Sequence, residues 1–370
     1  MNEDKASKYH RLRRRADLLG TVVAGLVLLG LTITNGAQRL RDISGGTDSA
    51  PTVAVMATLL LVILQAVEFP FAFYQGHLLE HRYGLSTQTF RHWLADQAKG
   101  IGLGMVLAIA GSSIVFFTLR HSPDAWWWIS AAIFAVATVG LARLAPVVLL
   151  PIFYKFKPLD RPALAGRLLS LATRARTDVV GVFEWVLSGH TRKANAALAG
   201  MGKTRRILLS DTLLADYSED EIEVILAHEL AHHVHRDLWR GIGVQAGVLA
   251  GGFFAADRIL RLLIEPLHLT GISDPAALPA LMLIGGVWSF LLMPLANAFS
   301  RAQERAADRY ALTTTRNVDA FVTAMKRLSQ QNLAEEYPSP LVRWLFYSHP
   351  PIRERIAAAR AFGREGHHAA

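Results

Sequence analysis

The chain has 370 residues, of which 52% are hydrophobic and only 19% are charged, a balance typical of membrane proteins rather than of soluble domains. It contains no cysteine, which excludes disulfide frameworks, thiolate metal sites and cysteine nucleophiles. The formal net charge of +9 could indicate a nucleic-acid partner, so the positions of the charges decide how it is interpreted.

Six apolar stretches are long enough for a helix to cross a hydrocarbon layer that is about 30 Å thick. They cover residues 17–35, 53–74, 100–119, 126–151, 241–263 and 278–299. The fifth stretch is the weakest because Asp257, Arg258 and Arg261 crowd its end. The first follows several arginines, as the apolar run of a signal peptide would. Because five further spans come after it, we expect it to remain as an anchor.

The basic residues are distributed unevenly between the two sides of these spans. Most of the 39 Lys and Arg residues lie before Ala16, in segments 76–99 and 152–240, and after Phe299. The intervening loops carry only Arg39, Arg41 and Arg120. Because short cytoplasmic loops are enriched in Lys and Arg, we expect both termini and the two large polar segments to be cytoplasmic. Topology thus explains the net charge, and we expect no nucleic-acid partner.

One cation, Arg143, lies within the fourth span, where insertion scales put the cost of a charged side chain at roughly 2.5–3.5 kcal/mol. Charges inside the membrane usually face the interior of the helix bundle or a water-filled cavity. Arg143 could therefore line a polar cavity, or it could pair with Glu68 of the second span, and the sequence favours neither.

The polar segment 152–240 combines short strand-like runs with a strongly capped helix. Turn residues separate three runs of β-forming residues, at Val179–Leu187, Ala194–Leu198 and Arg206–Leu209. A capping box formed by Ser218 and Glu221 then begins a helix that the apolar spacing extends over about 219–237. We therefore expect a small α+β domain within an otherwise mainly α polytopic membrane protein.

This capped helix carries the run His228-Glu229-Leu230-Ala231-His232. Histidines at i and i+4 lie one turn apart on the same face, so both imidazoles can reach a zinc ion at about 2.0–2.1 Å. Glu229 would then contact the water on the metal rather than the metal itself. Zinc lowers the pKa of that water, and Glu229 would accept its proton as the water attacks a carbonyl carbon. The pattern therefore predicts hydrolysis with Glu229 as general base.

A catalytic zinc needs a third protein ligand and an open fourth position. The best candidate is Glu304, which lies where the sixth span emerges into the cytoplasm. Asp308 lies one turn further on and could hold a zinc-bound imidazole in the correct tautomer. The fifth and sixth spans form a hairpin that returns the chain to the two histidines. This favours a ligand role for Glu304 over an acidic pair on a solvated helix face.

Together with further blocks, these motifs resemble the type I CAAX prenyl endopeptidases, integral-membrane zinc metallopeptidases with a His-Glu-x-x-His core. The similarity runs from about residue 68 to 360, and the excess of Arg over Lys points to a bacterial member. The matching blocks, in chain order, are Leu79–Ser86 with Asp96 and Lys99, Pro151–Leu159, Ser188–Gly200, Leu209–Leu214, the zinc helix, Glu304 with Asp308, and His349–Ile356.

The resemblance implies roles at positions that the residues alone would not single out. Asn195 and Ala196 would lie on an edge strand beside the zinc, where a peptide substrate can add as an extra strand. His349 and Arg355 would point into the site and donate hydrogen bonds to the substrate backbone and to the developing oxyanion. The family's fold also implies that the spans surround a large water-filled chamber, which the zinc domain closes at its cytoplasmic end.

We expect a zinc metalloendopeptidase of the CAAX prenyl protease type, with one zinc per chain and a peptide or lipidated peptide as its substrate. Membrane lipid is its expected surrounding, in a bacterial inner membrane, or in the ER membrane if the source is eukaryotic. Two alternatives stay open at this point. One is a zinc protease that removes misfolded membrane proteins, and the other is a non-catalytic, zinc-stabilised chamber that binds lipidated peptides. The sequence does not indicate an oligomeric state.

The expected organisation has five parts. These are a basic cytoplasmic tail (1–16), four transmembrane helices (17–151), a cytoplasmic zinc-protease domain (152–240), a transmembrane hairpin (241–299), and a cytoplasmic segment with the third ligand and the last site residues (300–370).

Overall fold

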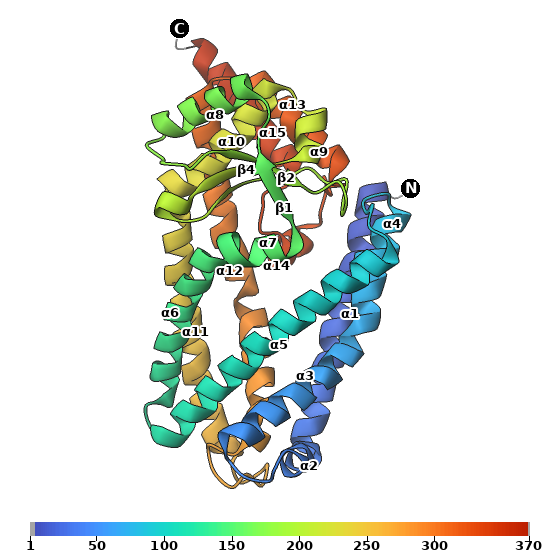
Figure 1. The fold of residues 1–370 in the computed structure, drawn as a ribbon, viewed down its shortest axis with the longest axis vertical. Coiled ribbons are helices and arrows are strands. Elements are labelled where there is room, and N and C mark those ends of the chain that lie inside the picture. Colours follow the sequence, from blue (N-terminus) through green and yellow to red (C-terminus); the bar gives the residue numbers. More distant parts are fainter. Residues whose placement is uncertain (1–3, 369–370) are drawn as a thin grey trace.

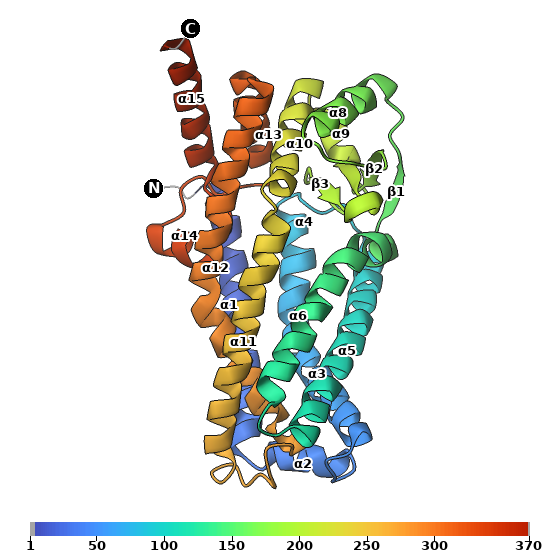
Figure 2. The same cartoon turned by 90° about the vertical axis from the view of Figure 1, so that its left-hand side faces the viewer.

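The computed structural model describes residues 4–368 and has two parts along its long axis (Figure 1). Long helices form one part, and a small sheet with further helices forms the other. Both chain ends lie toward the part that carries the sheet (Figures 1 and 2). These features confirm the predicted fold class, a mainly α-helical polytopic membrane protein with a small α+β domain.

The helical part is built from long helices that run side by side (Figure 2). They are α1 (Lys5–Ile33), α3 (Ala50–Phe73), α5 (Phe90–His121), α6 (Trp126–Leu144), α11 (Asp237–Leu263) and α12 (Leu278–Thr315). Shorter helices complete the fold: α2 (Gly36–Ile43), α4 (Glu80–Arg82), α7 (Leu150–Phe153), α9 (Asp211–Asp216) and α14 (Pro340–Phe346). Ser49 and Thr89 cap the amino ends of α3 and α5, because each side chain accepts a backbone N–H of the first turn.

Five helical stretches of the described chain are long and apolar enough to cross a membrane, and they contain α1, α3, α5, α6 and α12. The predicted fifth span, 241–263, forms α11, which does not reach this level of apolarity. Charged residues at its end lower the apolarity of α11. Contacts with other side chains of the helix bundle neutralise Asp257 at that end. Asp257 accepts hydrogen bonds from Trp126 Nε1 at 2.7 Å and from Arg261 Nε at 3.0 Å. Because α11 packs along α6 and α12, it still forms the expected hairpin with α12.

The predicted basic tail, residues 1–16, is helical where the structure describes it, because α1 already begins at Lys5. Tyr9 is buried and donates a hydrogen bond of 2.5 Å to Glu80. Arg14 forms an ion pair of 2.6 Å with Glu335. These contacts attach the first turns of α1 to distant parts of the chain, so this segment is not a free tail. Residues 1–3 lie outside the described residues.

The two alternatives for Arg143 can be compared with its position near the end of α6. Both Arg143 and Glu68 of α3 are exposed on their helices. No ion pair joins them within residues 4–368, so the proposed pairing is not formed.

The smaller part contains a four-stranded sheet in the order β1-β2-β4-β3. Its strands are β1 (Lys155–Pro158), β2 (Val182–Val186), β3 (Ala196–Ala199) and β4 (Arg206–Ser210). β2 and β4 are parallel, whereas β1 with β2 and β3 with β4 are antiparallel. Three strands lie within or overlap the predicted runs. The sequence does not predict β1, because its short run is rich in lysine and only pairing with β2 makes it a strand.

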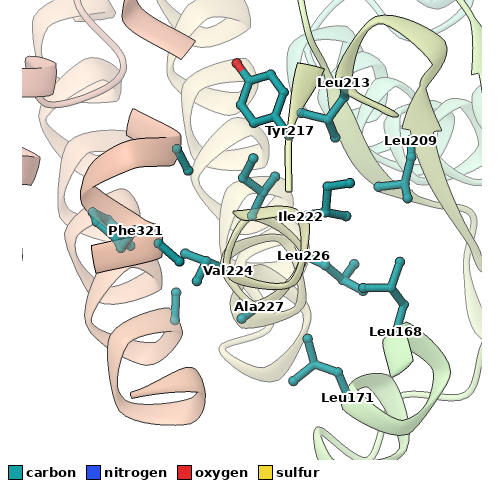
Figure 3. Close-up of a cluster of buried hydrophobic side chains, with 14 of the residues drawn as sticks. Leu168, Leu171, Leu209, Leu213, Tyr217, Ile222, Val224, Leu226, Ala227 and Phe321 are labelled. Atoms are coloured by element: carbon teal, nitrogen blue, oxygen red, sulfur yellow. The ribbon is translucent and has the colours of Figure 1, made fainter. Parts of the chain in front are cut away.

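Apolar side chains from the sheet and the surrounding helices form the core of this part (Figure 3). The helices are α8 (Pro162–Arg174), α10 (Glu219–Val234), α13 (Val318–Gln331) and α15 (Ile352–His368). Leu168 of α8, Leu226 of α10 and Phe321 of α13 are fully buried in this core, and each contributes roughly 1.5–3 kcal/mol through burial. Because α10 also packs along α12, the helix that carries His228 and His232 is fixed from several sides.

Candidate metal centre

Helix α10 begins at the capping box that the sequence predicts. Ser218 Oγ accepts a hydrogen bond from the Glu221 N–H at 3.3 Å, and Glu221 Oε2 accepts one from the Ser218 N–H at 2.8 Å. The helix ends at Val234, slightly before the expected end. Arg236 then adopts a left-handed backbone conformation with φ 57°, and α11 begins at Asp237. This tight turn places Asp237 beside the end of α10.

The structure brings together the three residues that the sequence predicts as ligands. His228, His232 and Glu304 each bring one ligand atom to within 4.8 Å of the others. His228 Nε2 lies 3.2 Å from Glu304 Oε2, and His232 Nε2 lies 3.5 Å from Glu304 Oε1. The histidines come from α10, and Glu304 comes from the continuation of α12 beyond its apolar part. Two imidazole nitrogens and a carboxylate therefore converge on one point.

Carboxylates hold the other nitrogen of each imidazole. Asp308 Oδ1 lies 3.0 Å from His228 Nδ1, and Asp237 Oδ2 lies 2.9 Å from His232 Nδ1. A carboxylate at Nδ1 accepts the N–H of that nitrogen and leaves Nε2 with its lone pair free for a metal. Both histidines are therefore oriented with Nε2 toward Glu304.

These residues fit a divalent metal such as zinc. Glu304 Oε2 is buried and has no hydrogen-bond partner within residues 4–368, although His228 Nε2 lies nearby. A buried carboxylate oxygen without a partner is costly, and coordination to a metal would remove that cost. Two neutral imidazoles with one carboxylate are also a donor set of catalytic zinc. Burial lowers the pKa of His228, but the adjacent carboxylates of Asp308 and Glu304 outweigh it and raise that pKa to about 9, so the surroundings of this imidazole favour a positive charge.

Glu229 lies between the two histidines on α10, and it does not belong to the group of converging ligand atoms. Burial raises the pKa of its carboxyl group, whereas the nearby His228 and His232 lower it. A carboxylate whose pKa is raised, next to a metal site, is suited to accept and return a proton.

Strand β3 packs against α10 and forms an edge of the sheet. Asn195, just before β3, is exposed, and its N–H donates to Ser210 Oγ at 2.9 Å. Ala196 pairs with Leu209 of β4. In the sheet that the structure describes, the other side of β3 has no strand beside it. Asn195 and Ala196 thus lie on an edge strand next to the helix with the two histidines, where the family resemblance places them.

The segment near the C-terminus brings two further predicted residues to the site. His349 Nε2 lies 3.3 Å from Glu304 Oε1, and the His349 side chain is 60% exposed. Arg355, in the first turn of α15, is buried and donates to Asp308 from Nε at 2.8 Å and from Nη2 at 2.5 Å. Two nitrogens of its guanidinium are thus directed at the carboxylate that holds His228. The expected hydrogen bond from Arg355 to the substrate stays a prediction.

Two polar residues of α12 fix the segment that carries His349. Arg301 Nη1 donates to the Tyr347 carbonyl oxygen at 2.5 Å, and Asn297 Nδ2 donates to the Leu345 carbonyl oxygen at 2.5 Å. The helix that supplies the third ligand therefore also positions His349. The sequence does not predict these contacts, because they join parts of the chain that only the fold brings together.

Two models of known families match this chain, and the boundary between the two matches lies close to β1. The family model described as CAAX prenyl protease N-terminal, five membrane helices, matches residues 2–155. The model described as peptidase family M48 matches residues 158–362, which is more than half of the chain. The chain belongs to peptidase family M48. Both the membrane helices and the domain with the metal centre thus have counterparts in characterised families, and the M48 match contains all three converging ligands.

Individual relatives of this M48 chain come from bacteria and eukaryotes. A metalloprotease of Bacillus subtilis, YhfN, is 32% identical over 288 residues, which are 77% of this chain and 68% of that protein. CAAX prenyl protease 1 of Saccharomyces cerevisiae is 29% identical over 328 residues, 81% of this chain and 70% of that protein. The crystal structure of S. mikatae Ste24p has the same fold, with a TM-score of 0.86 and 21% identity, covering 96% of this chain and 88% of that one.

The M48 chain is therefore an integral-membrane metalloendopeptidase, with the metal cofactor and the peptide substrates that this family implies. Its membrane-spanning helices and its small sheet domain agree with the expectation from sequence.

Asp237 is the residue of the M48 centre that sequence reasoning misses. The signal in the sequence is an acidic residue five positions after the second histidine, but its direction depends on the left-handed turn at Arg236. We expect Asp237→Ala to weaken metal affinity by about 10–100-fold, because His232 loses the carboxylate that fixes its tautomer. Competition with a chelating dye measures this affinity. Asp319→Ala, an exposed acidic residue of α13, is the control, and equal affinities in the two variants would contradict the role of Asp237.

Proposed function

We propose that this peptidase hydrolyses peptide bonds with a single zinc ion bound by His228, His232 and Glu304, and with Glu229 as general base. The observation that carries the proposal is the convergence of three ligand atoms within 4.8 Å. In addition, a carboxylate contacts the Nδ1 atom of each histidine and so orients its Nε2 atom toward the metal position. Zinc is favoured over other divalent metals because the donors are two imidazoles and one carboxylate with an open fourth position.

The zinc ion and the residues around it have different roles in hydrolysis. Zinc, when bound, supplies Lewis acidity that lowers the pKa of a water molecule and polarises the scissile carbonyl group. Glu229 accepts a proton from the attacking water and returns it to the leaving amine, a role that suits a carboxyl group whose pKa is raised by burial. Asp308 and Asp237 keep both imidazoles in the tautomer that binds metal through Nε2.

Four further residues act on the substrate or on the site. Asn195 and Ala196 offer the free edge of β3, so an extended peptide can pair there as an additional strand. His349 is exposed next to Glu304 and is placed to donate a hydrogen bond to the oxyanion that develops at the attacked carbonyl. Arg355 is a positioning residue in this proposal, because it holds Asp308 against His228.

The metal centre and both chain ends face the cytoplasm in this proposal, and the membrane is a bacterial inner membrane. Two observations support this orientation. Most Lys and Arg residues lie in the segments that surround the sheet domain, as expected for cytoplasmic segments. Both chain ends lie toward that same part of the molecule (Figure 1).

For the substrate we propose a lipidated peptide, because several relatives are named CAAX prenyl protease 1. The helical part contains a feature that suits a hydrocarbon chain. A cavity of about 410 Å³ lies among α3, α5, α6, α11 and α12, and most of its lining is apolar, including Leu61, Leu249 and Trp288. We therefore expect the lipid of the substrate to be held among the membrane helices while the peptide reaches the metal.

A pair of peptides tests both the activity and the substrate class. Detergent-purified protein is incubated with a farnesylated CAAX-type peptide or with its unlipidated twin, and the products are identified by mass spectrometry. We expect kcat/KM for the farnesylated peptide to be at least about tenfold higher, which corresponds to roughly 1.4 kcal/mol of additional transition-state binding. Equal rates would keep the peptidase but contradict the lipid requirement and favour removal of misfolded membrane proteins. No cleavage of either peptide by zinc-loaded protein would contradict the proposed substrate class.

A further inference from the structure

A second group of metal-ligating side chains lies away from the catalytic centre, where the membrane helices meet the sheet domain. It consists of His92 and Asp96 at the beginning of α5 and His190 in the loop between β2 and β3. The three residues each bring one ligand atom to within 4.8 Å of the others, as closely as the ligands of the catalytic centre do. None of the three takes part in the proposed hydrolysis.

The geometry of this group is compatible with a metal ion. His92 and Asp96 are at i and i+4, so both side chains project from the same face of α5. His190 approaches from the sheet domain, with Nδ1 3.3 Å from Asp96 Oδ2 and its ring centroid 5.1 Å from that of His92. The side chains of His190 and Asp96 are only 19% and 16% exposed, whereas His92 is exposed and leaves a route from solvent.

The loop that carries His190 is fixed on both sides. The backbone carbonyl oxygen of His190 accepts hydrogen bonds at 3.3 Å from the Thr87 N–H and from Ser86 Oγ, and both residues lie in the segment that leads into α5. Earlier in the loop, Asp211 accepts the backbone N–H groups of Leu187 and Ser188 at 2.9 and 3.0 Å. His190 is therefore held beside α5 before any ligand binds, which reduces the entropic cost of assembling the site.

The side chain of Gln88 shows that the two inner ligand atoms already converge on a donor. Its amide nitrogen donates to Asp96 Oδ2 at 2.6 Å and lies 3.2 Å from His190 Nδ1. A cation bound between Asp96 and His190 would displace this amide nitrogen, so the side chain of Gln88 would have to rotate away when the ion binds.

The surrounding charges decide which cation fits. Burial lowers the pKa of His190, and Asp96 offsets this only in part. Lys99 Nζ lies 3.2 Å from Asp96 Oδ1 and leaves Oδ2 facing His190. Because two of the three donors are imidazoles, the site disfavours the oxygen-seeking Ca²⁺ and Mg²⁺ and suits Zn²⁺, Co²⁺ or Ni²⁺.

We propose that His92, Asp96 and His190 form a second binding site for a divalent transition metal, which links α5 of the membrane domain to the β2–β3 loop of the peptidase domain. This loop continues through Asn195 into β3, the edge strand next to the catalytic helix. Metal bound at His190 thus restrains the segment that leads to the proposed substrate strand. The second site does not depend on the proposed function, because it shares no ligand with the catalytic centre.

The test counts the metal ions that the full-length protein retains. Purified protein is saturated with Co²⁺ and passed through gel filtration, and the retained metal is measured by mass spectrometry. We expect the unmodified chain to hold about one ion more per chain than His92→Ala or His190→Ala, since each variant removes a direct ligand of the second site. Glu304→Ala, which removes a ligand of the first site only, is expected to keep the second ion. His121→Ala, an exposed histidine at the far end of the same α5, is the matched control.

We expect His92→Ala and His190→Ala to cleave the test peptide still, and this cleavage would show that both variants are folded. Equal metal content in the unmodified chain and both variants would overturn the second site. Hydrogen exchange provides an independent readout: Zn²⁺ is expected to slow amide exchange over residues 187–196 in the unmodified chain and not in His190→Ala. Exchange that does not respond to Zn²⁺ in the unmodified chain would overturn the proposed link to β3.

Discussion

The Glu304→Ala variant is expected to be purified with almost no zinc at the catalytic centre and to show no measurable peptide hydrolysis. Glu304 is one of the three residues whose ligand atoms converge, and both of its oxygens face imidazole nitrogens. Its loss should therefore lower metal affinity well beyond the ~10–100-fold expected for loss of an outer carboxylate. Zinc per chain, measured by mass spectrometry after dialysis, checks the first expectation, and cleavage of the farnesylated peptide checks the second.

The substitution of a second glutamate near the site separates loss of a ligand from loss of a negative charge. Glu354→Ala removes a carboxylate that pairs with Arg305 and Arg343 at the surface and does not face the histidines. We expect this control to keep both zinc and activity. Full zinc occupancy in Glu304→Ala, measured with the second site blocked by His190→Ala, would mean that the third ligand lies elsewhere in the chain.

The parts of the site that follow from local sequence rules could be predicted. The capping box at Ser218 sets the beginning of α10, and the i, i+4 spacing sets the shared face of His228 and His232. The hairpin of α11 and α12 accounts for the return of Glu304 to that face, because a helix that continues in line with its apolar part has few directions available. Each of these inferences needs only residues that lie close together in the sequence, or one reversal of the chain direction between two helices.

The contacts that could not be predicted depend on the tertiary fold. Asp237 reaches His232 only because Arg236 adopts a left-handed conformation, which is uncommon for a residue other than glycine. Arg355 meets Asp308 because α15 packs beside α12, a contact between segments that are distant in the sequence. The group around His190 joins residues about a hundred positions apart, so no local pattern marks it. The fold class follows from apolarity and spacing, but these pairings need coordinates.

The second large effect is expected for Glu229→Gln, which should retain its zinc and lose peptide hydrolysis by about 10²–10⁴-fold in kcat. Glutamine has nearly the same shape as glutamate, but its amide cannot accept a proton from water. The side chain is not one of the converging ligands, so metal content should stay at the level of the unmodified chain. Single-turnover cleavage of the farnesylated peptide, with zinc measured on the same sample, gives both values.

Glu223→Gln is the matched control, because it makes the same chemical change on the same helix. Its carboxylate pairs with Arg167 and Arg174 on the side of α10 that faces α8, away from the metal ligands. If Glu229→Gln retained full activity, proton transfer in this site would have to use another group, and His349 would be the next candidate because it lies beside Glu304. If Glu229→Gln lost its zinc, the carboxylate would be part of the metal site, and the assignment of three ligands would be incomplete. Loss of hydrolysis with zinc retained, in Glu229→Gln but not in Glu223→Gln, therefore distinguishes a general base from both a ligand and a merely structural carboxylate.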